Sequence, residues 1–348
     1  MSIDKQRFRR IATEEAWAPP DLVRRFRDAI RDGSVDDPGF RSLMGYFLFG
    51  ESPRTKAIVE RLQDLGERRI ADMDSSGIAQ QVVALTAPGV QIFDAATAAA
   101  LSVEYNDRLA EACARYPDRL SPLAAVAPQD PGHAAGELER AVTRLGMKGA
   151  IINSHTRGEY LDDERFWPIF EAAEALDVPV YLHPQTPPRS MIEPFLARGL
   201  DGAIYGFGVE TGLHMLRLIV SGVFDRFPKL KVIVGHLGEG IPFWLFRIDF
   251  FHRSIVATRR YASVKPLERR PSDYLRENFY VTTSGMAWEP AILFVRSVLG
   301  ADRVMYAMDY PYQFVPEEVA VTDGLPISDE EKQALYATIA ERVFKLGG

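Results

Sequence analysis

The sequence contains almost no cysteine. Cys113 is the only one among 348 residues, so an intrachain disulfide and a thiolate-rich zinc site are both excluded. Cys113 lies in an alanine-rich stretch with helical spacing, where we expect a small core residue.

Long apolar runs are also missing. No run approaches the roughly 20 residues that a membrane-spanning helix needs. The N-terminal residues are charged and contain arginine, without the apolar segment and small-residue cleavage site of a signal peptide. We therefore expect a cytoplasmic protein.

The chain has no excess of positive charge. Its 41 Lys and Arg residues are outnumbered by 48 Asp and Glu residues, which gives a net charge of −7. This balance argues against nucleic acids or anionic membranes as partners, because no basic stripe is available to neutralise phosphates. No glycine-rich phosphate loop follows an early strand either, which disfavours a doubly wound nucleotide-binding sheet.

What the sequence does contain is a regular series of short apolar runs rich in Val, Ile, Leu and Ala. They lack polar alternation, as expected of strands buried on both faces. Stretches with helical spacing separate them. The pattern predicts a (β/α)8 barrel, a single domain over residues 1–348 with its active site at the C-terminal ends of the strands. The eight runs are 10–16, 80–87, 120–127, 149–153, 179–183, 231–236, 279–284 and 303–309.

Two segments exceed what a bare barrel needs. Residues 18–55 form an insertion after the first strand that carries Pro19-Pro20 and an aromatic cluster. Residues 184–207 would cover the same face. Long insertions on a catalytic face are typical of lids or subunit contacts, and we expect that role for 18–55.

Four predicted strands end on residue types that bind metals: Glu14, His183, His236 and Asp309. A carboxylate that ends an apolar strand must be paired, hydrogen-bonded or metal-bound. Asp309 has the alternative role of capping a helix. Strand alternation allows only one of Glu14 and Glu15 to face the barrel mouth and does not say which. A mixed N/O ligand set suits a divalent ion such as Zn, Mn or Fe acting as a Lewis acid.

Nine segments of the chain resemble one protein family, the decarboxylase branch of the amidohydrolase superfamily, from end to end. Within this branch, the chain is similar to the subgroup that decarboxylates 5-carboxyvanillate. The segments are RIATEEAW at 10–17, LGERRIADMDSSGI at 65–78, VAPQDP at 126–131, INSHT at 152–156, YLHP at 181–184, DGAIYGFGVETG at 201–212, VGHLGE at 234–239, SGMAWEPAI at 284–292 and RVMYAMDYPYQ at 303–313.

The resemblance implies one divalent metal, typically manganese with zinc as an alternative, held by Glu14, His183 and Asp309. It thereby selects Glu14 over Glu15. Related decarboxylases carry Glu-x-His on the first strand, whereas Ala16 fills the last position of that motif here. This departure points to the carboxyvanillate subgroup and away from hydrolase activity.

The chemistry of decarboxylation assigns roles to further residues. The ring carbon that bears the carboxylate must be protonated, and we expect Asp309 to be the donor. His236 and Glu239 are three residues apart, so the carboxylate can orient the imidazole as a proton relay. The alternative for Glu239 is to cap the next helix.

Five residues are candidates for substrate binding. Arg247 offers its fork of donors to a carboxylate. The resemblance implies the same for Arg54, reaching across from a neighbouring subunit. Tyr312 is expected to donate a hydrogen bond to the bound carboxyl group, and Trp17 and Phe207 to line an aromatic pocket.

Together these features predict a carboxy-lyase that converts an ortho-hydroxylated aromatic acid, 5-carboxyvanillate, to vanillate and CO2. Two alternatives keep the fold: a metal-dependent hydrolase or hydratase of a ring-fission product, and a catalytically silent binding barrel. The expected partners are a small aromatic carboxylate and further copies of the chain, as a homodimer or homotetramer.

Overall fold

Every strand of the barrel pairs with its neighbours in parallel. The computed structural model describes residues 7–347. Hydrogen-bonded ladders join the strands in the orders β1-β2-β3 and β4-β5-β6-β7-β8-β9. The strands are β1 Ile11–Trp17, β2 Gln80–Leu85, β3 Leu120–Pro122, β4 Ala124–Ala125, β5 Ala150–Asn153, β6 Val180–His183, β7 Val232–Val234, β8 Phe279–Thr282 and β9 Val304–Met305.

Backbone hydrogen bonds close the two ladders into one ring. Leu123, between β3 and β4, donates to Val83 of β2, and Ala124 donates to the carbonyl of Gly149. On the other side, Thr13 and Ala16 of β1 donate to the carbonyls of Tyr306 and Tyr310. The result is the (β/α)8 barrel that the sequence predicts, with all eight predicted runs in the ring and the third split at Leu123.

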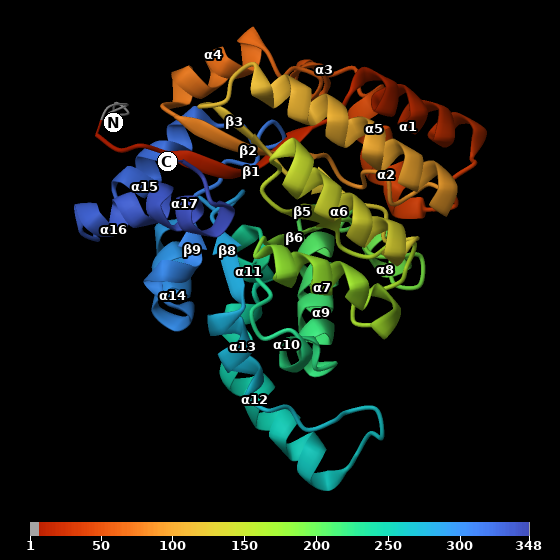
Figure 1. The fold of residues 1–348 in the computed structure, drawn as a ribbon, viewed down its shortest axis with the longest axis vertical. Coiled ribbons are helices and arrows are strands. Elements are labelled where there is room, and N and C mark those ends of the chain that lie inside the picture. The colour runs from red at the N-terminus through yellow and green to blue at the C-terminus, as the bar shows by residue number, and fades with distance from the viewer. Residues whose placement is uncertain (1–6, 348) are drawn as a thin grey trace.

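Helices surround this ring (Figure 1). They are α1 Pro20–Asp32, α2 Pro38–Phe49, α3 Pro53–Leu62, α4 Glu67–Ser76, α5 Ala95–Ala114, α6 Pro131–Leu145, α7 Trp167–Leu176, α8 Glu193–Leu196, α9 Gly206–Val220, α10 Val223–Arg226, α11 His236–Glu239, α12 Ile241–Thr258, α13 Pro271–Glu277, α14 Glu289–Leu299, α15 Val319–Asp323, α16 Asp329–Gln333 and α17 Ile339–Phe344. Shorter turns are the 3₁₀ segments Glu164–Phe166, Ala301–Arg303 and Pro316–Glu318, and the π-helical segment Ala334–Thr338.

The strands are almost completely buried because helices cover their outer faces and side chains fill the interior. The insertion at 18–55 forms α1, α2 and the start of α3. Its Phe47 packs edge-on against Tyr312 with 5.0 Å between ring centroids. The insertion therefore lies beside the residues that follow β9, and its role as a lid or subunit contact stays a prediction.

Two features bear on the predicted domain and location. The single-domain organisation over 1–348 stays a prediction. Residues 1–6 and 348 lie outside the described part of the chain, so the prediction made from the N-terminal residues concerns residues that the structure does not describe. Across residues 7–347, none of the helices combines the length and apolar character that crossing a membrane requires.

Candidate active site

The carboxylate of Glu14 is held from one side and free on the other. Its Oε2 accepts hydrogen bonds from the hydroxyls of Tyr181 and, at 3.0 Å, Thr282. Its Oε1 is buried and has no hydrogen-bond partner. The sequence did not single out Tyr181 and Thr282, although Tyr181 shares a strand face with His183 two residues away. These two hydroxyls fix the carboxylate so that Oε1 points into the site.

His183 presents a lone pair to that free oxygen. Its Nδ1 lies 2.8 Å from the carbonyl of Pro184. Because a carbonyl only accepts, Nδ1 carries the hydrogen and Nε2 keeps its lone pair. Burial lowers the pKa of His183, which favours this neutral form. Nε2 lies 3.5 Å from Oε1 of Glu14, so two electron-rich atoms face each other across a gap.

These donor atoms fit a metal ion. A small cavity of about 20 Å³ is lined by Glu14, His183 and Asp309, the three predicted ligands, and is large enough for one ion or water. Within residues 7–347, no three His, Cys, Asp or Glu side chains already stand at ligand distances from one point. The 3.5 Å between Nε2 of His183 and Oε1 of Glu14 already suits two donors to one ion, because ligands at ~2.0–2.2 Å from a shared ion lie about 3–3.6 Å apart.

Glu14 is the residue whose carboxylate faces His183, although Glu15 also borders the small cavity. The pairing register of β1 with β2 shifts between Ala12 and Glu15, which breaks strict alternation. Glu15 accepts hydrogen bonds from the backbone N–H groups of Met308 at 3.0 Å and Tyr310 at 3.1 Å. It therefore anchors the two residues that flank Asp309.

Asp309 stands where the small cavity meets a larger one, since it lines both. Its φ of +64° is strained for a residue other than glycine. The next helical segment begins only at Pro316, so Asp309 is not a helix cap. Burial, reinforced by Glu14 and opposed by His236, raises the pKa of Asp309 to about 8. In the metal-free chain, the carboxyl group of Asp309 therefore holds a proton at neutral pH.

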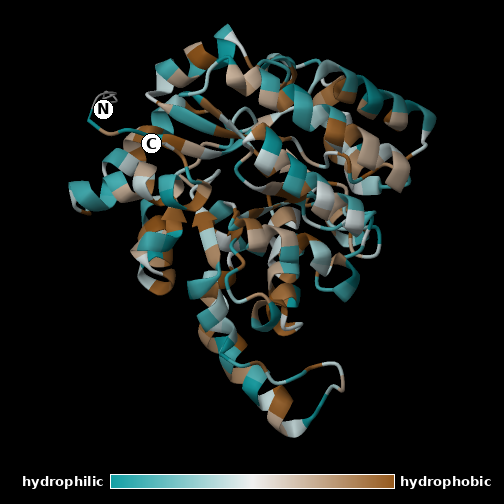
Figure 2. Ribbon diagram, viewed as in Figure 1, coloured by the Kyte–Doolittle hydropathy of each residue, from teal (hydrophilic) through white to brown (hydrophobic). Residues whose placement is uncertain are grey.

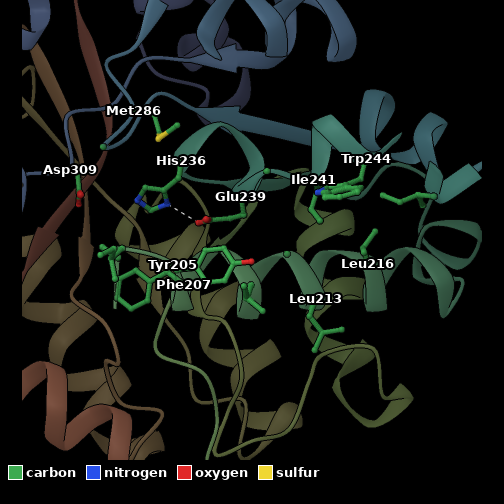
Figure 3. Close-up of a pocket in the computed structure, with 18 of the residues that line it drawn as sticks. Tyr205, Phe207, Leu213, Leu216, His236, Glu239, Ile241, Trp244, Met286 and Asp309 are labelled. Atoms are coloured by element: carbon green, nitrogen blue, oxygen red, sulfur yellow. Dashed lines mark hydrogen bonds and ion pairs between the residues drawn. The ribbon is translucent and has the colours of Figure 1, made fainter. Parts of the chain in front are cut away.

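His236 and Glu239 sit on a left-handed turn. Their φ values are +51° and +53°, and the residues between them are also left-handed. The turn brings Nδ1 of His236 to 2.7 Å from Oε1 of Glu239, the contact drawn as a dashed line in Figure 3. Glu239 makes no cap for α12, which begins after Gly240.

The charge of this pair favours the protonated imidazole. Burial alone would lower the pKa of His236, but the carboxylates of Glu239 and Glu14 outweigh it and raise the pKa to about 10. Its Nε2 lies 3.9 Å from Oε1 of Glu14. The imidazolium can therefore hold a proton at the edge of the site.

The larger cavity has a volume of about 940 Å³, enough for a substituted benzoate. His236, Glu239, Asp309, Phe207 and Arg247 line it. Figure 3 shows His236, Glu239 and Asp309 near Phe207, with Trp244 on the far side. The structure thus brings these five predicted residues to one chamber.

The remaining predicted residues lie around it. Tyr312 is half-buried and its hydroxyl lies 2.6 Å from Oγ1 of Thr86. Arg54 is exposed and donates to the carbonyl of Tyr312 in its own chain at 3.1 Å. Trp17 packs in the hydrophobic core, and the cavity wall described above does not include it. The substrate-binding roles of these three residues stay predictions.

Comparison with known proteins gives consistent matches over almost the whole chain. The family profile described as amidohydrolase matches residues 59–346. A gamma-resorcylate decarboxylase from Polaromonas sp. is 38% identical over 294 residues, covering 82% of this chain and 89% of the relative.

Two solved structures are similar in fold and sequence. A 5-carboxyvanillate decarboxylase from Novosphingobium aromaticivorans, complexed with manganese and 4-hydroxy-3-methoxy-5-nitrobenzoic acid, superposes with a TM-score of 0.96 at 51% identity, covering 99% of this chain and 97% of that one. A 5-carboxyvanillate decarboxylase from Sphingomonas paucimobilis gives a TM-score of 0.91 at 40% identity, covering 98% of this chain and 100% of that one.

Proposed function

The chain belongs to the amidohydrolase family and is a metal-dependent carboxy-lyase of hydroxylated aromatic acids, and we propose that its substrate is 5-carboxyvanillate, which it converts to vanillate and CO2. The observation that carries the proposal is the free, buried oxygen of Glu14 facing the lone pair of His183. This arrangement supports the presence of a metal cation in the small cavity, next to Asp309, which also lines the large cavity.

The metal site would be formed by Glu14, His183 and Asp309. A divalent ion held there, manganese by analogy with the Novosphingobium enzyme, supplies positive charge to which a phenolate and the adjacent carboxylate can chelate. Tyr181 and Thr282 contribute by fixing the direction of Glu14.

Asp309 would deliver the proton. Its carboxyl group lines the substrate cavity, and in the metal-free chain burial raises its pKa to about 8, so the group can carry a proton near neutral pH. Transfer of that proton to the ring carbon bearing the carboxylate forms a C–H bond and suspends aromaticity. Cleavage of the bond to the carboxylate then releases CO2 and restores the ring, so the net change replaces a carboxylate with a hydrogen.

His236 would store the proton that restores Asp309. The imidazolium is stabilised by Glu239, and both side chains line the same cavity as Asp309. Gly285 lies beside both side chains, because a Cβ there would lie 3.3 Å from Cδ2 of His236 and 3.5 Å from Oδ2 of Asp309.

Two features favour 5-carboxyvanillate over a dihydroxybenzoate. Ala16, which lines the small cavity, leaves the metal site without a ligand from that position. In addition, 5-carboxyvanillate keeps a second carboxylate, which Arg247 on the wall of the large cavity would bind. A dihydroxybenzoate has only the carboxylate that is lost.

The proposal is tested by measuring CO2 release and product formation with 5-carboxyvanillate and 2,6-dihydroxybenzoate in parallel. We expect vanillate to form from the first acid with the higher kcat/KM. We also expect a chelator to abolish turnover and Mn²⁺ to restore it. A higher kcat/KM for 2,6-dihydroxybenzoate would overturn the substrate assignment.

The hydrolase alternative is tested in the same assay. It predicts that an ester, lactone or enol acid from ring fission is consumed without CO2 release. We expect no such turnover, because the similar proteins described above, at 38–51% identity, are decarboxylases.

A further inference from the structure

Residues 65–78, one of the segments that resemble the decarboxylases, place a charged side chain inside the protein. Figure 2 shows hydrophilic and apolar residues interspersed along the helix of this segment, α4. Among the hydrophilic ones, Arg69 is 0% exposed. Burying an arginine is costly unless hydrogen bonds and an opposite charge compensate it. Arg69 therefore needs a compensating partner.

Arg69 donates hydrogen bonds in three directions. Its Nε donates to the carbonyl of Asp64 at 2.8 Å, and its Nη2 donates to the carbonyl of Ala16 at 2.7 Å. Its Nη1 donates to Oε1 of Gln81 at 3.1 Å. All three acceptors are uncharged, so these contacts satisfy the nitrogens of the guanidinium without neutralising its charge.

Gln81 connects Arg69 to the opposite charge. Its Nε2 donates to Oε2 of Glu15 at 3.4 Å. Glu15 is 1% exposed, so the carboxylate is buried as well. An amide suits this position, because its oxygen accepts from the guanidinium while its nitrogen donates to the carboxylate. Arg69 and Glu15 thus form a buried ion pair that is bridged by one side chain.

Both members of this pair act on the chain around Asp309. The carboxylate of Glu15 accepts the backbone N–H groups on either side of Asp309, as described above. The guanidinium of Arg69 lies over the ring of Tyr310, 4.6 Å from its centroid, which is within the range of cation–π attraction. The hydroxyl of Tyr310 donates to Asp72, also on α4, at 3.0 Å. The two neighbours of Asp309 are therefore fixed by their backbone, and Tyr310 also by its ring.

Asp309 needs such contacts because of its backbone. Its φ of +64° is unfavourable for a residue other than glycine and persists only where the surrounding structure enforces it. If residues 308–310 were released, this backbone would relax. The carboxyl group would then leave the place where the two cavities meet.

We propose that Arg69 is a positioning residue for Asp309, and that together with Glu15 it keeps the carboxyl group between the metal site and the substrate cavity. The inference rests on the proposed function, because it takes Asp309 as a metal ligand and proton donor. Arg69 itself does not line the small cavity or the substrate cavity. It acts through Glu15 and Tyr310.

The variant Arg69→Lys tests this role. Lysine keeps the charge but has no planar fork, so it cannot donate to all three acceptors. We expect the Mn²⁺ affinity of the metal-free chain to fall about 10-fold, and kcat of the Mn²⁺-loaded enzyme for 5-carboxyvanillate to fall about 10-fold with KM changed less than about twofold. Arg296→Lys is the matched control, because Arg296 is also buried, at 7% exposure, but lies on α14 and pairs with Glu331. It should lower the melting temperature similarly and leave Mn²⁺ affinity and kcat unchanged.

A double-mutant cycle separates positioning from a general loss of stability. When Asp309→Asn is already present, Arg69→Lys should change Mn²⁺ affinity and kcat by less than about twofold, because the carboxylate that it positions is gone. A purely structural role would lower both quantities by the same factor in either background. That result would overturn the proposal, as would wild-type Mn²⁺ affinity and kcat in Arg69→Lys.

A second variant keeps the test decisive if Arg69→Lys fails to fold. Tyr310→Phe removes only the hydrogen bond to Asp72 and should lower Mn²⁺ affinity about threefold. Tyr274→Phe is its control, because Tyr274 is also buried, donates to a carboxylate and lies under an arginine, at 4.4 Å from Arg269. Wild-type affinity in Tyr310→Phe, or an equal loss in Tyr274→Phe, would contradict the proposal.

The Mn²⁺ measurements do not depend on the substrate. If the wild-type enzyme does not turn over 5-carboxyvanillate but Arg69→Lys still loses Mn²⁺ affinity only in the presence of Asp309, the proposed substrate is wrong and the positioning role is supported. Failure of the function and failure of the positioning role are therefore distinguishable.

Discussion

Gly235 lies directly against the carboxylate of Glu14. A Cβ at this position would lie 2.5 Å from Oε2 and 2.8 Å from Oε1, closer than side-chain carbons approach other atoms. The φ of Gly235 is −68°, so the backbone itself would accept another residue. Glycine is therefore required here for space and not for conformation, and the space belongs to the side chain that we assign to the metal.

The first prediction concerns this contact. Gly235→Ala should push the Glu14 carboxylate away from His183 and lower manganese affinity by about 10–100-fold, as changes beside metal ligands do. The measurement is metal content after dialysis against graded Mn²⁺. Gly136→Ala is the control, because a Cβ there meets nothing within 4 Å, and it should bind metal normally. Equal affinity in both variants would argue against Glu14 as a ligand.

The second prediction concerns Asp309. Asp309→Asn should keep the fold but lower kcat by roughly a thousandfold, because the amide cannot give up the proton that the ring carbon needs. Circular dichroism checks that the variant is folded, and an assay of CO2 release measures its kcat. Near-normal turnover in a folded variant would exclude Asp309 as the proton donor.

The third prediction concerns the pH dependence of metal binding in the metal-free chain. The pKa of Asp309 is raised to about 8, so below this pH a cation must displace a proton to reach the carboxylate. Affinity should therefore rise with pH by up to ~10-fold per unit below about 8 and level off above it.

Titration calorimetry at several pH values measures this slope. Asp309→Asn should flatten it between pH 7 and 8. Glu210→Gln should retain it, although burial also raises the pKa of Glu210 to about 8, because Glu210 does not line the cavities described above. The same slope in Asp309→Asn as in the wild-type chain would contradict the assignment.

The fourth prediction separates binding from chemistry. Arg247→Gln should raise KM for 5-carboxyvanillate by about 10–100-fold, the loss of one charge-assisted contact, with a smaller change in kcat. Arg253→Gln, on the same helix and outside that cavity wall, should leave KM unchanged. If both variants raise KM alike, α12 acts through its position and not through Arg247.

Most of the barrel was predictable because its strands are buried on both faces and end abruptly on polar residues. That same logic identified His183 and Asp309 as strand-end residues. It did not separate Glu14 from Glu15, because the register shift in β1 depends on how that strand pairs with β2. Nor did it reveal Tyr181. Its hydroxyl donates a hydrogen bond to Glu14, and this contact depends on the position of β6 relative to β1 in the folded barrel.

The projection of α12 away from the barrel (Figure 1) was beyond prediction for a different reason. Its apolar residues have the spacing of an ordinary buried helix, and the sequence carries no signal for which helices of a barrel lie on its body. Likewise, His236 and Glu239 lie three positions apart, and this spacing predicted that the carboxylate contacts the imidazole. The observed turn is left-handed, and it was the hydrogen bond and not the handedness that the spacing indicated.

The final prediction tests whether Glu239 holds the charge of His236. In the wild-type metal-free chain the imidazole should remain protonated up to about pH 10, since the carboxylates of Glu239 and Glu14 favour the charged form more than burial opposes it. Glu239→Gln keeps the shape but removes one of those charges, so the pKa of His236 should fall and the proton should be lost at lower pH. Nuclear magnetic resonance of the histidine ring carbons measures this change in the pKa of His236.

The control variant is Glu289→Gln, which removes an exposed carboxylate at the start of α14 and should not change the pKa of His236. If Glu239→Gln and the wild-type chain titrate alike, Glu14 alone stabilises the imidazolium. A lower pKa together with a lower kcat at pH 8 would instead support His236 as the group that returns the proton to Asp309.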